Sequence, residues 1–207
     1  MKPNGVNAAG MRLGLMGGTF DPIHYGHLAA AEVARYEFGL VKVVFIPAGQ
    51  PPHKTGQKIS PAAHRLAMVR LAVASNPFFE VSTVEIDRPG PSYTVETVSA
   101  FRHLYSSAEI YFITGADAVA EISTWRRIEE LLRLCWLVAV TRPGYLLEDL
   151  REWLVKPELW RKILTLQVPG VAVSSTEIRE RVRAGRPVKY LLPEAVEEYI
   201  VRHGLYT

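Results

Sequence analysis

The stretch that decides the fold runs from Leu13 to His27 and reads LGLMGGTFDPIHYGH. Its short apolar run predicts a buried strand that ends at Gly17-Gly18. Two glycines at this point let the backbone approach an anion closely and point N–H groups toward it. From His27 to Phe38 the apolar residues recur at the helical period, which predicts a helix. A strand, a glycine turn and a helix in this order favour an anion site at the helix N-terminus.

The alternation of strands and helices continues along the whole chain. Further strands are predicted at Lys42–Pro47, Phe79–Ile86, Glu109–Thr114, Trp136–Thr141 and Ile163–Val168. Further helices are predicted after the N-cap pair Ser60-Pro61, over Val95–Phe101, Trp125–Leu132, Ser175–Ala184 and Pro193–His203. This order predicts an α/β fold, a doubly wound and mostly parallel sheet with helices on both faces. We expect a main domain over residues 1–170 and a small helical C-terminal subdomain over residues 171–207.

Composition excludes several classes of protein. The 207 residues are 48% hydrophobic and 22% charged, as in an ordinary globular chain. A single cysteine, Cys135, excludes a disulfide scaffold. The longest apolar run, Leu134–Val140, is far shorter than the ~18 residues of a spanning helix, so no membrane partner is expected. No apolar segment of the signal-peptide type follows Lys2, and a cytoplasmic location is expected. Whether the chain starts at Met1 or Met11 stays open.

The net charge of +3 does not by itself identify a partner. Nucleic-acid binders usually gather Lys and Arg on one face with aromatic residues between them. Here the basic residues are scattered, and the densest group, from Arg179 to Arg186, alternates with glutamate and apolar positions. Such a run is typical of a solvated helix face. We therefore expect no nucleic-acid partner.

Two histidines lie at the predicted start of the first helix. His24 and His27 are three residues apart, and both can face the same bound anion. Imidazole groups there could stabilise negative charge that builds up on a phosphorus centre. The alternative is a Gly-Gly turn followed by two surface histidines. The combination of strand, Gly-Gly-Thr-Phe, Asp-Pro and His-x-Gly-His is far more specific than such a turn alone.

This stretch resembles the signature of the H-x-G-H nucleotidyltransferases, which share a Rossmann-like domain with class I aminoacyl-tRNA synthetases. Its form, G-G-T-F-D-P-x-H-x-G-H-L, is similar to that of the bacterial nicotinate-mononucleotide adenylyltransferase family. Further motifs of that family match at Pro51–Lys54, Asp87–Thr94, Gly115–Asp117 with Trp125, Arg142–Tyr145 and Ser174–Arg179. The resemblance rests on the whole set in the right order, since no single motif would suffice.

The resemblance implies a reaction in which ATP and nicotinate mononucleotide give deamido-NAD and pyrophosphate. The nucleophile would be a phosphate monoester oxygen, mostly deprotonated at neutral pH because its second pKa is about 6. No general base is then needed, and catalysis must come from in-line positioning and charge neutralisation. A Mg²⁺ ion would bridge phosphate oxygens with few protein ligands, so no protein metal site is predicted.

The resemblance also assigns residues to roles. The expected catalytic residues are His24, His27, Lys54 and Arg179. The expected ATP-binding residues are Gly17, Gly18, Thr19, Phe20, Gly115, Asp117, Ser174, Ser175 and Thr176. The expected nicotinate mononucleotide-binding residues are Tyr93, Thr94, Trp125 and Arg142. Where many family members have a second aromatic residue after the tryptophan, this chain has Arg126, whose guanidinium could favour a nicotinate carboxylate.

Several of these residues have a second interpretation. Lys54 could be an ordinary exposed loop lysine, and Ser174 with Glu177 makes a capping box that would simply stabilise a helix. Asp117 could favour the dipole of a helix N-terminus, and Trp125 could be a core residue.

Other functions also stay open. Phosphopantetheine adenylyltransferases and cytidylyltransferases share the first motif, and a non-catalytic nucleotide sensor is a further alternative. A synthetase fragment is disfavoured because no anticodon-binding domain fits in 207 residues. A homo-oligomer is neither predicted nor excluded.

Overall fold

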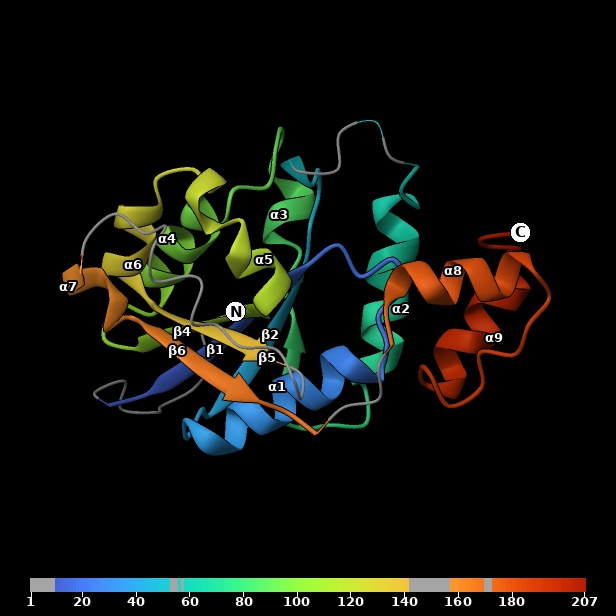
Figure 1. Cartoon of the computed structure of the whole chain (residues 1–207), viewed down its shortest axis with the longest axis horizontal. Helices are drawn as coiled ribbons and strands as arrows, with labels where there is room; N and C mark the ends of the chain where they lie inside the picture. The colour runs from blue at the N-terminus through green and yellow to red at the C-terminus, as the bar shows by residue number, and fades with distance from the viewer. Residues whose placement is uncertain (1–9, 53–55, 57, 142–156, 170–172) are drawn as a thin grey trace.

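A computed structural model describes residues 10–52, 56, 58–141, 157–169 and 173–207. Within this part of the chain, six parallel strands form one sheet in the order β3-β2-β1-β4-β5-β6 (Figure 1). The strands are β1 (Arg12–Gly18), β2 (Lys42–Pro47), β3 (Phe79–Val81), β4 (Glu109–Gly115), β5 (Trp136–Thr141) and β6 (Ile163–Gln167). The predicted α/β, Rossmann-like and doubly wound fold is confirmed, with every strand pair parallel.

The strand order reverses between β1 and β4, which lie side by side in the sheet. From β1 the chain moves outward through β2 to β3, then returns and moves the other way through β4 to β6. The loops that leave the carboxyl ends of β1 and β4 therefore diverge and leave a crevice between them. Ligands of open α/β sheets bind at such a point.

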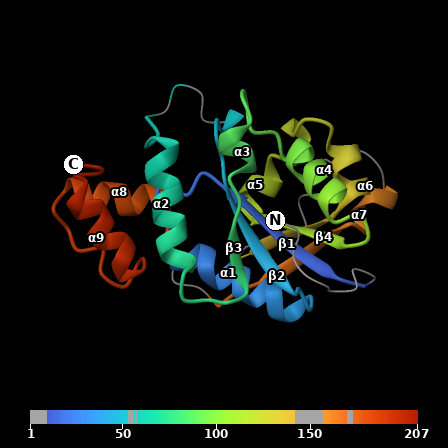
Figure 2. The same ribbon diagram turned by 180° about the vertical axis from the view of Figure 1, so that it is seen from behind.

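Helices cover both faces of the sheet (Figures 1 and 2). Helices α1 (Tyr25–Glu37) and α2 (Ala62–Val73) share one core with Met16 and Phe45 of the strands. Helices α4 (Thr94–Leu104) and α6 (Ile128–Leu134) share the other core with Leu15 and Ile46. Neighbouring strand residues enter opposite cores because side chains alternate across a sheet. Near-continuous apolar strands are what burial on both faces requires.

The C-terminal helices lie beside α2, away from the edge strand β6 (Figure 1). They are α8 (Ser175–Arg183) and α9 (Glu194–Arg202), and both end close to the glycines predicted to stop them. Ile178 and Val196 are buried in the same core as α1 and α2. A helical C-terminal segment is thus present, while a domain boundary at residues 170–171 stays a prediction.

One predicted strand is wrong in its second half. The sequence predicts a strand over Phe79–Ile86, but β3 ends at Val81 and a short helix, α3 (Val84–Asp87), follows. The Ser82 N–H still donates to the Phe45 carbonyl, and the chain then turns. The Thr83 carbonyl accepts hydrogen bonds from two N–H groups further along, which makes a helical turn. The alternation of apolar and polar residues simply continued past the end of the strand.

Three smaller predictions also need correction. Trp125 is not on a helix, because it follows the short 3₁₀ helix η2 (Ile122–Thr124) and precedes Arg127, whose φ of 52° separates it from α6. Helix α5 (Ala116–Ala120), which starts directly after β4, was not predicted. Helix α2 begins at Ala62 with Pro61 as its N-cap, so Ser60 does not cap it. A further short helix is α7 (Pro157–Trp160).

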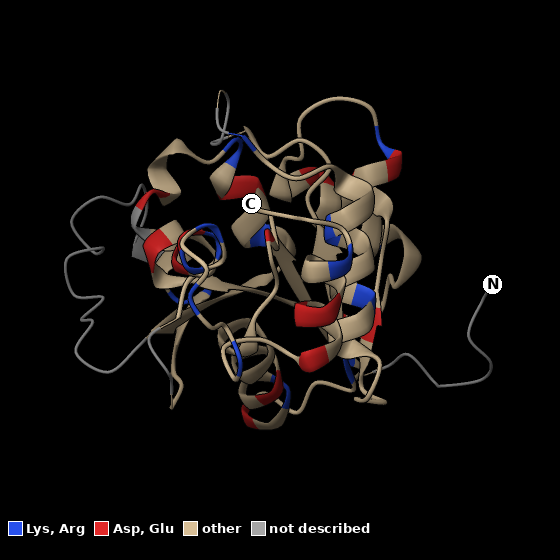
Figure 3. Ribbon diagram, turned by 90° about the vertical axis from the view of Figure 1, so that its right-hand side faces the viewer, with Lys and Arg blue, Asp and Glu red and all other residues tan. Residues whose placement is uncertain are grey.

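Acidic and basic residues are interspersed on the surface rather than separated (Figure 3). On α8, Arg181 Nε pairs with Glu177 Oε1 at 3.0 Å, and Lys189 pairs with Glu194 before α9. This pairing agrees with the interpretation of the basic run as a solvated helix face. In the part of the chain that the structure describes, no helix has the length and apolar character that a membrane crossing requires.

Candidate active site

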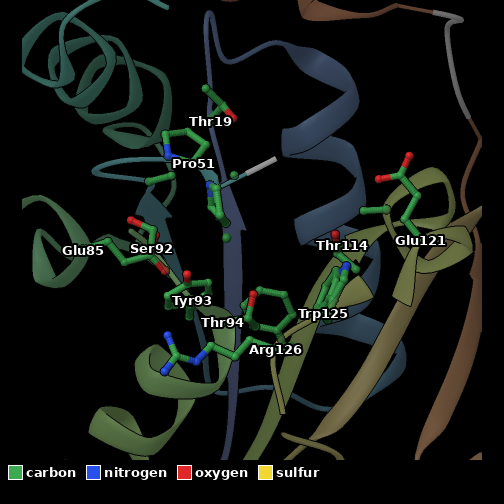
Figure 4. Close-up of a pocket in the computed structure, with 16 residues that line it drawn as sticks. Thr19, Pro51, Glu85, Ser92, Tyr93, Thr94, Thr114, Glu121, Trp125 and Arg126 are labelled. Atoms are coloured by element: carbon green, nitrogen blue, oxygen red, sulfur yellow. The ribbon is translucent and has the colours of Figure 1, made fainter. Parts of the chain in front are cut away.

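A pocket of about 300 Å³ opens at the carboxyl ends of β1, β2 and β4, at the point where the strand order reverses (Figure 4). It joins six of the residues that the sequence predicts for the site: Gly17, Gly18, Thr19, Tyr93, Thr94 and Trp125. The rest of its lining includes Ala48, Pro51, Pro52, Glu85, Ser92, Phe112, Thr114, Glu121 and Arg126. The pocket thus extends from the glycines at the end of β1 to Tyr93, Thr94 and Trp125, which are predicted to bind nicotinate mononucleotide.

Close packing within the protein leaves little space beside Gly17 and Gly18, the last two residues of β1. A Cβ on Gly17 would lie 2.8 Å from Phe112 Cζ, and a Cβ on Gly18 would lie 2.9 Å from the Phe20 ring. Gly115, after β4, differs because nothing in the protein lies within 4 Å of its Cβ position. Open space there is consistent with a ligand that approaches the backbone at the end of β4.

His24 and His27 stand together at the N-terminus of α1. His24 is the N-cap residue, and its backbone N–H donates to His27 Nδ1 at 3.2 Å. The two rings are stacked with centroids 3.8 Å apart, and the Phe20 ring contacts His27 edge-on at 5.1 Å. Because Nδ1 of His27 accepts a hydrogen bond, the neutral ring carries its proton on Nε2. Nε2 is therefore a hydrogen-bond donor for a ligand.

The backbone of this helix start is only partly open to an anion. The Tyr25 N–H donates to the Leu191 carbonyl of the C-terminal segment at 3.1 Å, which takes up one of the donors at the helix N-terminus. Gly26 has no room for a side chain, since its Cβ would lie 3.0 Å from His24 Nδ1. The N–H groups of Tyr25 and His27 at this helix start thus already have partners within the protein.

The Ser174–Arg179 motif is docked on the loop between β1 and α1. Ser174 Oγ accepts from the Glu177 N–H at 3.1 Å, which confirms the predicted helix cap. The Glu177 carboxylate, however, pairs with Arg181 instead of completing the capping box. Arg179 Nη2 donates to Thr176 Oγ1 at 3.1 Å. Hydroxyls and a guanidinium are gathered at this helix start, and their use as a second anion site stays a prediction.

Among the described residues, other predicted site residues do not line the pocket; besides those below, they are His24, His27, Gly115, Ser174, Ser175, Thr176 and Arg179. The Phe20 side chain is buried and does not line the pocket, which leaves its backbone for an ATP contact. Asp117 is exposed in the first turn of α5, where it also favours the helix dipole. Lys54 and Arg142 lie outside the described residues.

Glu85 and Ser92 form a buried polar connection that sequence reasoning missed. Ser92 Oγ accepts from the Gly49 N–H at 2.9 Å, and Glu85 Oε1 accepts from Thr97 Oγ1 at 2.6 Å. Ser92 is also hydrogen-bonded to the Glu85 carboxyl, beside it in Figure 4. Burial raises the pKa of Glu85, and the two hydroxyl donors oppose that rise. Ser92 is part of the matched Asp87–Thr94 motif, but Glu85 was assigned to a strand.

A buried arginine, Arg65, is hydrogen-bonded to three loops, and the sequence did not predict this role. Arg65 is 1% exposed and donates to three carbonyl oxygens: Ser60 O at 2.9 Å, Thr19 O at 2.8 Å and Gly49 O at 3.2 Å. Burial lowers the pKa of Arg65, and the negative charge of Asp21 opposes that shift. An arginine within an amphipathic helix gives no local signal that it is buried.

Aromatic residues and one cation form the outer part of the pocket. The half-buried Trp125 packs edge-on against Phe112 with centroids 6.2 Å apart. The Arg126 guanidinium lies 4.5 Å from the centre of the Tyr93 ring, a cation–π contact visible in Figure 4. Among the described residues that line the pocket, Arg126 is the sole lysine or arginine. Over the same described part of the chain, no three His, Cys, Asp or Glu side chains are grouped to hold a metal ion.

The fold and the pocket first define a class. Residues 15–181 match the model of the family described as cytidylyltransferase-like, so the chain has the architecture of that class. A solved structure titled nicotinic acid mononucleotide adenylyltransferase complexed with NaAD, from Plasmodium falciparum, has the same fold. It is 16% identical, its TM-score is 0.76, and the match covers 95% of this chain and 97% of that one.

Closer relatives are curated as probable nicotinate-nucleotide adenylyltransferases. One from Moorella thermoacetica is 56% identical over 200 residues, covering 94% of this chain and 91% of the relative. One from Thermoanaerobacter sp. is 55% identical over 199 residues, covering 95% and 94%. The chain belongs to the nicotinate-nucleotide adenylyltransferase family.

Proposed function

We propose that this chain transfers the adenylyl group of ATP to nicotinate mononucleotide, a step of NAD biosynthesis that gives deamido-NAD and pyrophosphate. The observation that carries the proposal is a pocket that joins the glycines at the end of β1 to Tyr93, Thr94 and Trp125. It lies at the strand-order reversal, where a dinucleotide fits across the two halves of the sheet. The family membership of the chain supports the same reaction.

In the proposed reaction a phosphate oxygen of the mononucleotide attacks the α-phosphorus of ATP. A new P–O bond forms as the bond from the α-phosphorus to the bridging oxygen breaks, and pyrophosphate leaves with that oxygen. The attacking phosphate is already deprotonated, so the protein need only align the reactants and stabilise negative charge.

The histidine pair is the proposed donor to the α-phosphate. His27 presents Nε2–H because its Nδ1 is already occupied by the His24 N–H. Thr176 and Arg179, with Ser175 and Lys54, are proposed to hold the β- and γ-phosphates. Gly115 and Asp117 are proposed to lie along the adenosine. A charge-stabilising donor of this kind typically contributes 10²–10³-fold to the rate.

The proposed pyridine site is the aromatic part of the pocket. Trp125 and Tyr93 supply flat apolar surface for the ring, and the Thr94 hydroxyl supplies a polar contact. Arg126, held over Tyr93, is proposed to attract the nicotinate carboxylate. A neutral carboxamide would not gain that charge interaction, so nicotinate mononucleotide is the preferred substrate. Arg142 keeps its predicted role at this site as a proposal.

Mg²⁺ is proposed to arrive with ATP as part of the substrate and to bridge phosphate oxygens. A reducing cytoplasmic compartment is proposed from the buried free thiol of Cys135.

The test is pyrophosphate release with ATP, Mg²⁺ and a panel of phosphate acceptors. We expect release with nicotinate mononucleotide, at least tenfold lower kcat/KM with nicotinamide mononucleotide, and none with phosphopantetheine. If phosphopantetheine were the one acceptor that gave pyrophosphate release, or if CTP supported release in place of ATP, the chain would have the activity of another branch of the class. ATP binding without release from any acceptor would indicate a nucleotide sensor.

A further inference from the structure

The loop between β1 and α1 is held by side chains of the C-terminal helix α8. Its Asp21 carbonyl accepts from Arg179 Nη1 at 2.8 Å, and its Pro22 carbonyl accepts from Ser175 Oγ at 2.9 Å. Hydrogen bonds from distant residues to consecutive carbonyls restrict the backbone of a loop more strongly than local turns do. Contacts with the C-terminal segment therefore help to fix the conformation of the loop that leads to the two histidines.

The Asp21 side chain is a second point of attachment. It is 3% exposed, and both of its carboxylate oxygens are hydrogen-bonded. Oδ1 accepts from the Tyr206 hydroxyl at 2.7 Å, and Oδ2 accepts from the Ser60 N–H at 3.1 Å. Arg65, itself buried, supplies the opposite charge nearby. With both oxygens engaged, the carboxylate has a single orientation.

Tyr206 comes from the segment that follows α9, 185 residues beyond Asp21 in the sequence. The backbone φ of Tyr206 is 69°, in the left-handed region, so the chain turns at this residue. Burial, and next the hydrogen bond to Asp21, raise the pKa of the Tyr206 phenol. The hydroxyl thus keeps its proton and stays a hydrogen-bond donor at neutral pH.

We propose that Tyr206 is a positioning residue for the adenylyl transfer, and that its hydroxyl, through the buried Asp21 carboxylate, sets the position of His24 and His27. The proposal rests on the function proposed above.

The mechanical connection from Asp21 to the histidines is short. Phe20 precedes Asp21, has a φ of 51° and is 2% exposed, and its ring edge contacts His27. Ile23 follows and is fully buried, and His24 then caps α1. A loop packed this tightly moves as a unit, so a displaced Asp21 displaces the imidazoles. Donors to a reacting phosphate lose much of their effect when they are displaced by about 1 Å.

The experiment compares Tyr206→Phe with Tyr190→Phe, a matched control. Tyr190 lies in the same C-terminal segment and is 80% exposed. At 25 °C we expect Tyr206→Phe to lower kcat about tenfold, with the KM for ATP changed by less than about twofold, because alignment is lost while the phosphate-holding groups remain. Tyr190→Phe should match the unaltered chain in kcat, KM and Tm.

A spectroscopic readout separates positioning from general loosening. The side-chain ¹⁵N NMR signals of His24 and His27 should shift in Tyr206→Phe and stay in place in Tyr190→Phe. The double variant Tyr206→Phe/Asp21→Asn should lose no more kcat than Asp21→Asn alone, since both changes break the same connection.

Two results would overturn the proposal: a lowered Tm with kcat unchanged at 25 °C, or histidine signals that do not move. If the unaltered chain transfers no adenylyl group to any acceptor, the proposed function fails. The NMR comparison would then still decide whether Tyr206 positions the histidines.

Discussion

At the scale of single residues, the two histidines are held by a reciprocal capping box at the start of α1. The His24 N–H donates to His27 Nδ1, the His24 side chain accepts from the His27 N–H, and the two rings stack, so a neutral His27 carries its proton on Nε2. The structure therefore explains a chemical detail, the tautomer, that the His-x-Gly-His spacing alone leaves open.

The first residue-scale prediction concerns His27→Ala. Removing the Nε2–H donor should lower kcat by about 10²–10³-fold while ATP binding weakens only modestly, because the donor acts mainly on charge that builds up in the transition state. Steady-state kinetics and ATP titration measure the two effects. His103→Ala is the control, because this exposed histidine lies on α4 and is bonded to the Ser99 carbonyl. Retention of most of the turnover by His27→Ala would rule out the assigned role.

The second residue-scale prediction concerns the cation in the pocket. Arg126→Gln should reduce kcat/KM for nicotinate mononucleotide about tenfold and leave the nicotinamide form nearly unchanged, because only the former carries a carboxylate. Kinetics with both substrates measure the ratio. Arg127→Gln is the matched control, since Arg127 pairs with Glu130 and does not line the pocket. Equal losses for both substrates would contradict a charge interaction with the pyridine substituent.

At the scale of elements, the loops after β2 and β3 are packed directly against each other. The Gly49 backbone lies against Glu85, Ser92 Oγ accepts the Gly49 N–H, and Arg65 donates to the Gly49 carbonyl. The loop after β2 leads to Pro51 and Pro52 of the pocket wall. The short helix α3 is thus part of the pocket wall. Because the sequence assigned this segment to a strand, Glu85 was not predicted as a pocket residue.

The element-scale prediction is that Gly49→Ala destabilises the protein. A Cβ there would lie 2.1 Å from the Glu85 carbonyl oxygen, so backbone must shift, at a typical cost of about 1–3 kcal/mol. Urea unfolding measures the change in the free energy of unfolding. Gly115→Ala serves as the comparison: its Cβ would meet nothing within 4 Å, so stability should hold while the KM for ATP rises. Equal stability of Gly49→Ala and the unaltered chain would contradict the packing argument.

At the scale of the whole molecule, two cores lie on opposite faces of one parallel sheet. Helices α8 and α9 extend the core that contains α1 and α2, so the C-terminal segment is packed onto the histidine loop. The other core contains α4, α6 and Cys135. The proposed site therefore draws on both cores, because Phe20 beside the histidine pair belongs to the first and Tyr93 and Trp125 pack against the second.

The whole-molecule prediction uses Cys135 as a probe of this packing. The thiol is 3% exposed, and burial raises its pKa to about 12, so very little thiolate forms at pH 8. We expect an aromatic disulfide reagent to leave the folded protein unmodified and to modify one thiol per chain in concentrated guanidinium. Added ATP should slow any residual reaction, because a ligand of the folded state suppresses opening. Rapid modification of the native protein would show that the second core opens locally.

The sequence by itself determined the strands and most helices, because their periodicity is carried by near neighbours. It also determined the histidine pair, and Tyr93 and Trp125 as pocket candidates. The predicted glycine turn is instead the end of β1, where Gly17 and Gly18 pair with β2. Trp125 was located correctly although the helix assigned to it was wrong. The failures are Glu85, whose strand-like pattern ran on past β3, and the Ser60 cap, because α2 begins at Ala62 and Pro61 takes the N-cap position.

Only the tertiary structure decided which distant groups meet. Arg65 is an ordinary helix residue in the sequence, and its burial follows from three loops that converge on it. Arg179 reaches the Asp21 carbonyl across 158 residues and Tyr206 reaches the Asp21 carboxylate across 185. Such contacts have no local signal, because they depend on where the sheet places its crossovers and on how the C-terminal helices pack against α2. The sequence predicted which groups take part in the chemistry, and the tertiary packing determines how those groups are held.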